Sequence, residues 1–188
     1  LLVGLGNPGS NYTNTRHNIG FKIIDAINAH FKLSKQKPKF KGLLTTGNIE
    51  SKKIYAIKPL TFMNNSGTAI KELIDYFKID AKDVFVFHDD MDIDFGKIKA
   101  KFGGSSAGHN GIESIDKFIG KDYSRVRIGI GHPKQKKKVN NHVLEDFKED
   151  EEEKINEITE NIVKQLPTLI EKKIDLFSSK VNQDLNGI

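Results

Sequence analysis

Two side chains of this sequence, His17 and Asp89, are of the types that together activate a water molecule. A neutral imidazole, with an ordinary pKa of about 6.5, can accept a proton from water at cellular pH. A carboxylate on the other ring nitrogen fixes the tautomer and stabilises the imidazolium, and this works equally when the nucleophile is water. The pair therefore predicts a hydrolysis that needs no nucleophilic side chain. The alternative is a loop histidine and a turn acid without chemistry, because such groups also occur in structural networks.

Three asparagines, Asn7, Asn64 and Asn110, lie in three different polar segments, each beside Gly, Met or His. A carboxamide both donates and accepts hydrogen bonds, which suits the binding of a peptide-like backbone or an ester oxygen. Turn formation is the commoner role of Asn in loops, so both interpretations stand at this point.

The segment Gly4-Leu5-Gly6-Asn7-Pro8-Gly9 matches the dinucleotide-binding pattern G-x-G-x-x-G, but its context does not. In that motif a helix opens inside the glycine run, and an acidic residue ends the next strand about 20 residues on. Here Asn7-Pro8-Gly9 is a turn tripeptide, and Asp25 falls inside the next expected helix. We expect a strand, a tight turn and a polar loop that forms one wall of a pocket.

The segment Gly104-Ser105-Ser106-Ala107-Gly108 matches G-x-S-x-G, the nucleophile elbow of α/β-hydrolases. The elbow needs a buried strand before the serine and a helix directly after it. The strand expected before Ser106 carries a row of lysines, and His109-Asn110-Gly111 delays the helix. A serine esterase remains an alternative, but a glycine-rich cradle for phosphate or for a substrate chain fits this loop better.

The chain has no cysteine, which excludes disulfides, thiolate nucleophiles and Cys-ligated zinc and fits a reducing cytosol. A metal site from other side chains is a further alternative. Its ligands would be His88, Asp89, Asp90 and His109, although these residues do not have the spacing of ligands on one helix.

The 188 residues, 37% of them hydrophobic, suffice for one domain with a full core. No run of 18 apolar residues occurs that could span a membrane. The formal net charge of +5 suggests a polyanionic partner, although excess Lys also keeps a surface solvated. Of the 30 basic residues three are Arg, and all lie near the glycine and histidine motifs: Arg16, Arg125 and Arg127. Phosphate contacts and core ion pairs would both use guanidinium groups there.

Hydrophobic periodicity predicts the elements that must position these groups. Helices are expected at Asn18–Phe31, around Ile70–Phe77, at Ile112–Ile119 and from Glu149 to about Lys180, with a kink or break at Pro167. Strands are expected at residues 1–3, 42–49, 54–58, 83–87, 96–102 and 125–131. The strand at 83–87 reads as central, being apolar on both faces, and Lys32–Lys41 is expected to be a basic connection.

The order of these elements predicts a single α/β domain over residues 1–188, with a mixed, mostly parallel sheet and helices on both faces. The sheet is expected to be mixed because a hairpin interrupts the alternation of strands and helices. In open sheets of this kind the ligand site lies beyond the strand ends. Four polar loops can therefore contribute to it: residues 7–18, 61–66, 88–92 and 103–111.

The chain resembles bacterial-type peptidyl-tRNA hydrolases in six segments that follow the family's order over about residues 1–147. These segments are Val3-Gly4-Leu5-Gly6-Asn7-Pro8-Gly9, Thr15-Arg16-His17-Asn18, Lys58-Pro59-Leu60-Thr61-Phe62-Met63-Asn64, His88-Asp89-Asp90-Met91-Asp92, Gly108-His109-Asn110-Gly111 and Arg127-Ile128-Gly129-Ile130-Gly131-His132-Pro133. Their coincidence is far more specific than any one of them, whereas the C-terminal helices are generic.

The resemblance implies a monomeric, cytoplasmic α/β enzyme that uses no metal or cofactor. Its substrate would be peptidyl-tRNA, and it would recycle tRNA by hydrolysing the ester to a peptide or an N-blocked amino acid. His17 would be the general base, Asp89 would hold it in its basic form, and Asn7 would distinguish N-blocked from free aminoacyl ends. Further positions match contacts to the tRNA-linked substrate (Tyr12, Phe62, Asn64 and Asn110), the lining of the cleft (Met63 and His109) and a clamp on tRNA phosphate (Lys101 and Arg127).

One stretch departs from the family's pattern, because Ser105-Ser106-Ala107 stands where Gly and His are often more frequent. No matched catalytic position is lost there. The main rival function is an RNA-binding module on the same fold that lacks catalysis, and the intact His17, Asn7 and Asp89 argue against it. The basic segment Lys134–Lys138 is a further expected contact to tRNA phosphate.

Overall fold

The computed structural model describes residues 1–133 and 139–186, so the basic segment 134–138 lies outside the described residues. The described residues form one sheet of seven strands in the order β2-β3-β4-β1-β5-β7-β6. The strands span Leu2–Gly4 (β1), Lys37–Lys39 (β2), Gly42–Ile49 (β3), Lys52–Pro59 (β4), Phe85–Asp90 (β5), Ile98–Phe102 (β6) and Ser124–Gly129 (β7).

The sheet is parallel in its middle and antiparallel towards its edges. Strand β1 pairs in parallel with β4 and β5, and β5 pairs in parallel with β7. The pairs β2·β3, β3·β4 and β6·β7 are antiparallel. This arrangement confirms the predicted mixed α/β sheet, with the parallel part confined to the four central strands.

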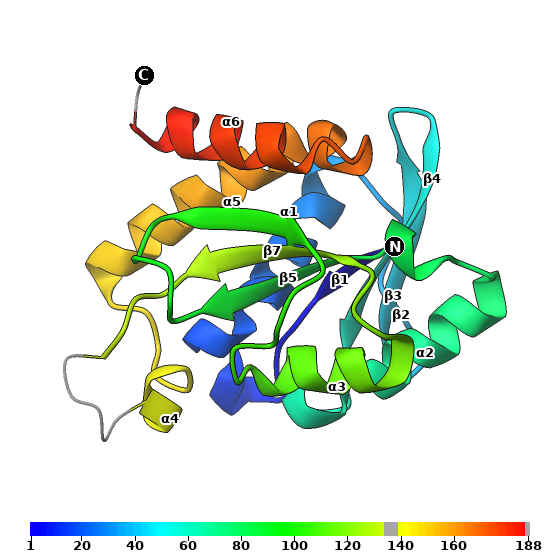
Figure 1. Cartoon of the computed structure of the whole chain (residues 1–188), viewed down its shortest axis with the longest axis horizontal. Coiled ribbons are helices and arrows are strands. Elements are labelled where there is room, and N and C mark those ends of the chain that lie inside the picture. The colour runs from blue at the N-terminus through cyan, green and yellow to red at the C-terminus, as the bar shows by residue number, and fades with distance from the viewer. Residues whose placement is uncertain (134–138, 187–188) are drawn as a thin grey trace.

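Helices cover both faces of the sheet, as predicted. One face packs against α1 (Ile19–His30), α5 (Glu149–Ile170) and α6 (Ile174–Asn186), and the other against α2 (Ser66–Phe77) and α3 (Asn110–Ile119). Figure 1 shows α5 and α6 on one side of the strands and α2 and α3 on the other. A short helix, α4 (Val139–His142), precedes α5, and short 3₁₀ turns occupy Ser10–Tyr12, Arg16–Asn18, Met63–Asn65 and Ala81–Asp83.

The first glycines of the dinucleotide-like segment serve the packing of α1 on the sheet. A Cβ at Gly4 would collide with the main-chain oxygen of Gly20 in α1, and a Cβ at Gly20 would collide with the backbone of Leu5. Helix α1 begins only at Ile19, well after the glycine run, so the helix does not open inside that run as the dinucleotide motif requires. The close approach of strand and helix therefore accounts for the glycines at positions 4 and 20.

Two predicted boundaries are wrong because strand pairing extends beyond the hydrophobic pattern. Lys37–Lys39, expected to be part of a basic connection, forms the edge strand β2 against β3, where Pro38 is tolerated because an edge leaves one side unpaired. The central strand starts at Phe85 and continues to Asp90, because residues 88–90 pair with β7. The pairing thus fixes the backbone of Asp89 inside the sheet.

Pro167 does not end the long C-terminal helix, which continues to Ile170 before the chain turns and α6 begins at Ile174. The expected kink or break at Pro167 is therefore displaced by about one turn. Within the described part of the chain, no helix is both long and apolar enough to cross a membrane.

Candidate active site

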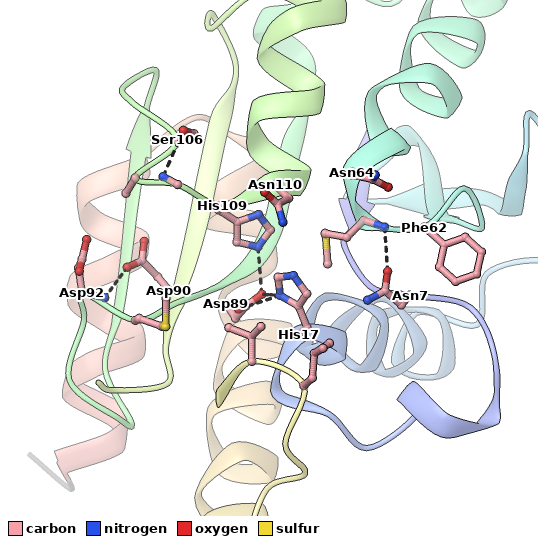
Figure 2. A pocket seen from close by; sticks show the side chains of 16 residues that line it. Asn7, His17, Phe62, Asn64, Asp89, Asp90, Asp92, Ser106, His109 and Asn110 are labelled. Atoms are coloured by element: carbon pink, nitrogen blue, oxygen red, sulfur yellow. Dashed lines mark hydrogen bonds and ion pairs between the residues drawn. The ribbon is translucent and has the colours of Figure 1, made fainter. Parts of the chain in front are cut away.

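A cleft of about 460 Å³ lies beyond the carboxyl ends of β1 and β5. Eight of the predicted site residues line it: Asn7, His17, Phe62, Met63, Asn64, Asp89, His109 and Asn110. The labelled side chains in Figure 2 converge from the loops that follow β1 and β4, from the end of β5 and from the start of α3. The four polar loops predicted from the sequence thus meet at one place.

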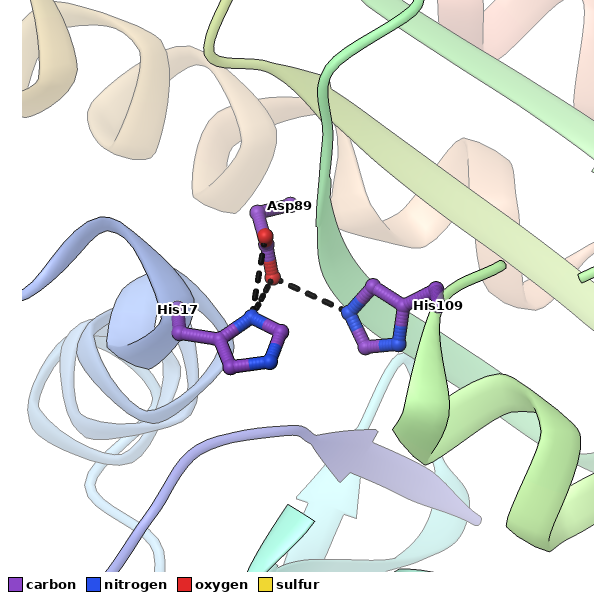
Figure 3. A group of neighbouring side chains, drawn as sticks. All are labelled: His17, Asp89 and His109. Carbon is purple, nitrogen blue, oxygen red and sulfur yellow. Dashed lines mark hydrogen bonds and ion pairs between the residues drawn. The ribbon is translucent and has the colours of Figure 1, made fainter. Parts of the chain in front are cut away.

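His17 and Asp89 form a buried hydrogen-bonded pair. The ring Nδ1 of His17 lies 2.8 and 2.9 Å from the two carboxylate oxygens of Asp89, and both side chains are less than 10% exposed. Because an ionised carboxylate only accepts hydrogen bonds, Nδ1 carries the hydrogen and Nε2 carries the lone pair. Nε2 is on the far side of the ring from Asp89 (Figure 3) and has no hydrogen-bond partner among the described residues. The lone pair of His17 is therefore available to a molecule in the cleft.

The backbone around His17 is held by the segment between α4 and α5, residues 143–146. The main-chain N–H of His17 donates to the oxygen of Val143 at 2.8 Å, and the N–H of Arg16 donates to Glu145 at 3.0 Å. Thr15 forms a β-bridge with Asp146. These contacts fix the 3₁₀ turn Arg16–Asn18 and with it the imidazole.

A second histidine, His109, also donates to Asp89, with Nε2 3.0 Å from Oδ1. Its other nitrogen, Nδ1, accepts the main-chain N–H groups of Gly111 and Ile112 and so caps the start of α3. Nδ1 therefore carries no hydrogen, and Nε2 must carry the one that is donated to Asp89. Asp89 accepts from two imidazoles, but only that of His17 has a free lone pair.

The electrostatics of this group favour an ionised Asp89 and a basic His17. Burial alone would lower the pKa of His17, but the charge of Asp89 and its hydrogen bond to the ring raise the pKa above its ordinary value. Burial alone would raise the pKa of Asp89, but the neighbouring His17 and His109 and their hydrogen bonds hold that pKa well below its usual range. The pair thus has the polarity that a general base requires.

Among the described residues, the side chains close enough to share a metal ion are His17, Asp89 and His109, with candidate ligand atoms within 4.8 Å of one another. The alternative metal set from the sequence is not assembled, since Asp90 pairs with Arg127 and His88 Nδ1 contacts the main-chain oxygen of Asp89. Burial, followed by the neighbouring His109, holds the pKa of His88 well below its ordinary value. The contacts of His17 and His109 to Asp89 have the lengths of hydrogen bonds.

Asn7 presents its side-chain nitrogen to the cleft. Its Oδ1 accepts the main-chain N–H of Met63 at 2.8 Å, which leaves Nδ2 without a partner among the described residues. In Figure 2 this nitrogen faces His17. The main chain of Asn7 is bound in turn by the side chain of Asn18, a residue to which the sequence assigned no role.

The remaining predicted contact residues lie at the edge of the cleft. Asn64 and Asn110 are exposed; Asn64 lies in the 3₁₀ turn before α2, and Asn110 is the first residue of α3. Phe62 is 53% exposed, and its ring packs edge-on against Tyr12 with centroids 6.5 Å apart. Tyr12 does not itself line the cleft and reaches it through Phe62.

Lys101 and Arg127 lie on the neighbouring strands β6 and β7, outside the cleft lining. Arg127 Nε donates to Asp90 Oδ2 at 2.7 Å, and Asp90 does line the cleft. The ammonium of Lys101 lies against Gly104, where a Cβ would collide with it. Burial, followed by the charges of Arg127 and Arg125, lowers the pKa of Lys101. These positive groups therefore gather beside the glycine-rich loop.

The other two arginines form core ion pairs, the second of the two interpretations that the sequence left open. Arg16 is 3% exposed and contacts Glu151 at 2.6 Å. Arg125 is 1% exposed and contacts Asp116 at 2.7 Å, while its second nitrogen donates to the main-chain oxygen of Ser105. Arg125 thus anchors the loop that carries Ser106.

Ser106 lines the cleft but lacks the surroundings of a nucleophile. It stands in the loop between Phe102, the end of β6, and Asn110, the start of α3, and not on a strand-to-helix elbow. Its Oγ donates to Glu113 at 3.2 Å. No histidine within the described ranges is hydrogen-bonded to it, so the serine-esterase alternative lacks an imidazole base.

Sequence reasoning missed several residues that build the site, namely Asn18, Asp90 as the partner of Arg127, and Val143 and Leu144 of the lining. Asn18 and Asp90 each directly follow a residue that was singled out. This adjacency could have drawn attention to both residues. The sequence does not show, however, in which direction their side chains point. Val143 and Leu144 carry no chemical signal, and only the long-range contact to the turn at His17 places them here.

A family model and the sequences of known relatives indicate the same family for this chain. A family model described as peptidyl-tRNA hydrolase matches residues 1–187. The peptidyl-tRNA hydrolase of Pelagibacter ubique (strain HTCC1062) is 72% identical over 182 residues, which cover 97% of this chain and 98% of that protein. The peptidyl-tRNA hydrolase of Ehrlichia ruminantium (strain Welgevonden) is 47% identical over 181 residues, 96% of this chain and 93% of that protein.

The fold has a matching solved structure. The crystal structure of peptidyl-tRNA hydrolase from Acinetobacter baumannii superimposes with a TM-score of 0.90 at 34% sequence identity. The match covers 96% of this chain and 93% of that one.

Proposed function

The chain belongs to the peptidyl-tRNA hydrolase family, hydrolases of the ester bond of peptidyl-tRNA, and from that premise we propose that His17 activates the attacking water. The observation that carries the proposal is the buried His17–Asp89 pair, whose free Nε2 faces the cleft. Asp89 stays ionised throughout and keeps the hydrogen on Nδ1.

In the proposed reaction, Nε2 of His17 takes a proton from water while the water oxygen bonds to the ester carbonyl carbon. The carbonyl electrons move to oxygen and give a tetrahedral oxyanion. When this intermediate collapses, the bond to the terminal ribose oxygen of tRNA breaks, and the imidazolium of His17 returns the proton to that oxygen. The products are a free peptide acid and a free tRNA hydroxyl, and no acyl-enzyme is formed.

Amide groups at the edge of the cleft supply the remaining stabilisation. We assign the oxyanion contact to Asn64 or to the backbone beside it, and a contact to the substrate to Asn110. One preorganised donor of this kind typically lowers the barrier by about 3 kcal/mol. Phe62, with Tyr12 behind it and Met63 beside it, forms the apolar wall against which the substrate lies.

Asn7 is the proposed discriminator of the blocked amino end. Because its Oδ1 is already bonded to Met63, Asn7 offers hydrogen-bond donors to the cleft. A donor pairs with the carbonyl oxygen of an N-acyl group or a peptide bond, whereas a free aminoacyl end carries an ammonium and lacks that carbonyl. This polarity favours peptidyl-tRNA over aminoacyl-tRNA.

Lys101 and Arg127 are the proposed clamp on a tRNA phosphate. Their mutual repulsion in the free protein, which contributes to the lowered pKa of Lys101, would be relieved by an anion between them. The carboxylate of Asp90 occupies Nε of Arg127 and leaves its terminal nitrogens for such a contact. We further propose that the enzyme acts as a cytoplasmic monomer, since every proposed site residue comes from one chain, and light scattering in solution tests the monomer.

Replacing the base tests the proposed mechanism. The variant His17→Ala should hydrolyse N-acetyl-aminoacyl-tRNA at least ~100-fold more slowly with little loss of tRNA affinity, because general-base catalysis supplies roughly 10²–10⁴-fold. The variant His30→Ala, which removes an exposed imidazole at the end of α1, is the matched control and should be unaffected. Near-normal turnover by His17→Ala would remove His17 from the mechanism, and the rival RNA-binding module without catalysis predicts no turnover by the unmodified protein either.

A further inference from the structure

The side chain of Asn18 binds both main-chain polar groups of Asn7, the N–H and the carbonyl oxygen. Its Oδ1 accepts the N–H of Asn7 at 2.8 Å, and its Nδ2 donates to the carbonyl oxygen of Asn7 at 2.9 Å. Asn18 is 5% exposed, so water cannot readily replace these bonds. The carboxamide takes the place of a neighbouring strand.

The backbone at Asn7 needs such a partner because it has left the sheet. Strand β1 ends at Gly4, and Leu5 makes the last sheet-like hydrogen bond, to Phe87. Pro8 follows directly and has no N–H to donate. The orientation of the Asn7 side chain therefore depends on two groups, Asn18 on its main chain and the Met63 N–H on its Oδ1.

Asn18 also follows His17 directly, within the same 3₁₀ turn. One side chain of this turn is bonded to Asp89 and the next to Asn7. The turn thus sets the distance between the nitrogen that would activate water and the amide that would bind the substrate's acyl group.

We infer that Asn18 is a positioning residue that determines selectivity for N-acylated substrates. It does so by holding the amide of Asn7 at a fixed position relative to His17. The inference rests on the proposed role of Asn7. The ligand recognised through this arrangement is the carbonyl group next to the blocked nitrogen, in an N-acetyl group or a peptide bond. Asn18 itself touches no substrate in this account.

The test compares kcat/KM for N-acetyl-aminoacyl-tRNA and for free aminoacyl-tRNA in three variants. In Asn18→Ala the preference for the acetylated substrate should fall about tenfold, the effect of misplacing one hydrogen bond. Affinity for deacylated tRNA should stay unchanged. Asn18→Asp, which keeps the acceptor but sets an oxygen against the Asn7 carbonyl, should lower the preference as well and serves if the alanine variant does not fold.

The matched control is Asn28→Ala, which removes a carboxamide from α1. This carboxamide is bonded to Thr45 and lies away from the cleft. It should lower thermal stability without changing the preference. If the Asn18 variants lose activity towards both substrates equally, so that the preference is unchanged, Asn18 is merely structural and the inference is wrong.

Asn7→Ala separates this inference from the proposal beneath it. An unchanged preference in Asn7→Ala would overturn the role of Asn7 itself. A reduced preference in Asn7→Ala together with a normal one in both Asn18 variants would overturn only the role of Asn18. If both roles are correct, adding Asn18→Ala to Asn7→Ala should reduce the preference no further, because the positioned group is already gone.

Discussion

At the scale of single residues, the capping bonds of His109 decide which histidine can be the base. Asp89 accepts hydrogens from His17 and His109, and an isolated view of the three side chains does not distinguish them. The two N–H groups of α3 occupy Nδ1 of His109 and so remove its lone pair from chemistry. What His109 contributes is a donor that spreads the charge of Asp89, and this limits how strongly Asp89 holds the proton of His17.

Two substitutions of His109 separate the cap from the donor. His109→Asn should still cap α3. His109→Ala should lose the cap and should be less stable than His109→Asn by about 1 kcal/mol. Both remove the donor to Asp89, so in both the pKa of His17 should rise further and the acid limb of kcat/KM should move to higher pH. Urea denaturation and a pH–rate profile measure the two effects. If the two variants are equally stable, His109 does not cap α3. If the acid limb of the pH–rate profile does not move, the hydrogen bond from His109 to Asp89 has no effect on His17.

Residue types and the place of Asp89 at a strand end suggested the pairing of His17 with Asp89, with a merely structural role as the open alternative. They could not predict that Asn18 binds the backbone of Asn7 or that the ring of His109 caps a helix. Both depend on side-chain direction, which is fixed by the 3₁₀ turn and by the start of α3.

At the scale of elements, the turn before α2 is under backbone strain at Phe62. This residue has φ 59° and ψ 159°, a conformation that is essentially restricted to glycine. The strain is maintained by the following 3₁₀ turn, in which the Asn65 N–H donates to the Phe62 oxygen. Its result is an aromatic ring held at the rim of the cleft, 53% exposed.

This strain predicts an inverted order of stability for two substitutions. Phe62→Gly should be more stable than Phe62→Ala by about 1 kcal/mol, because relief of a strain of roughly 1–3 kcal/mol outweighs the extra freedom of unfolded glycine. Both variants lose the ring, so both should raise KM for N-acetyl-aminoacyl-tRNA to a similar extent. Urea midpoints check the order, and an alanine variant as stable as the glycine variant would mean that Phe62 is not strained.

The elements that a hydrophobic pattern specifies were predictable, and those that depend on pairing were not. Helix α1 and strand β3 match their predicted bounds to within a residue. The Lys-Pro-Lys strand β2 and the polar end of β5 carry no such pattern and exist because a neighbouring strand offers its hydrogen bonds. The second of these places Asp89 inside the sheet, so the site depends on the part of the fold that the pattern did not show.

At the scale of the whole molecule, the net charge of +5 is consistent with tRNA as the partner, but the individual positive charges do different work. Arg16 and Arg125 are neutralised in the core. Lys101 and Arg127 lie on the neighbouring strands β6 and β7, close enough for the charge of Arg127 to lower the pKa of Lys101. The number of charges was available from the sequence, whereas their division between core and surface required the fold.

The salt dependence of tRNA binding tests this division. Lys101→Ala should flatten the slope of log Kd against log salt by about 0.7–0.9, the share of one phosphate contact. Lys53→Ala removes an exposed lysine at the start of β4, the end of that strand away from the cleft, and should leave the slope unchanged. Asn7→Ala should also leave it unchanged. An equal effect of both lysine variants would show that tRNA is attracted by the overall charge and that Lys101 forms no clamp.

The most direct test of the central claim is the pH profile of kcat/KM for N-acetyl-aminoacyl-tRNA in the wild type and in Asp89→Asn. General-base catalysis needs unprotonated His17, so the wild-type rate should rise with pH through the raised pKa of His17. Removing the charge of Asp89 leaves burial, which lowers that pKa. The acid limb of Asp89→Asn should therefore move to lower pH, while its plateau falls by roughly 10²–10⁴-fold because the tautomer is no longer fixed. A limb that stays in place, or a plateau that stays at the wild-type level, would contradict the assignment of His17 and Asp89 as the base and its partner.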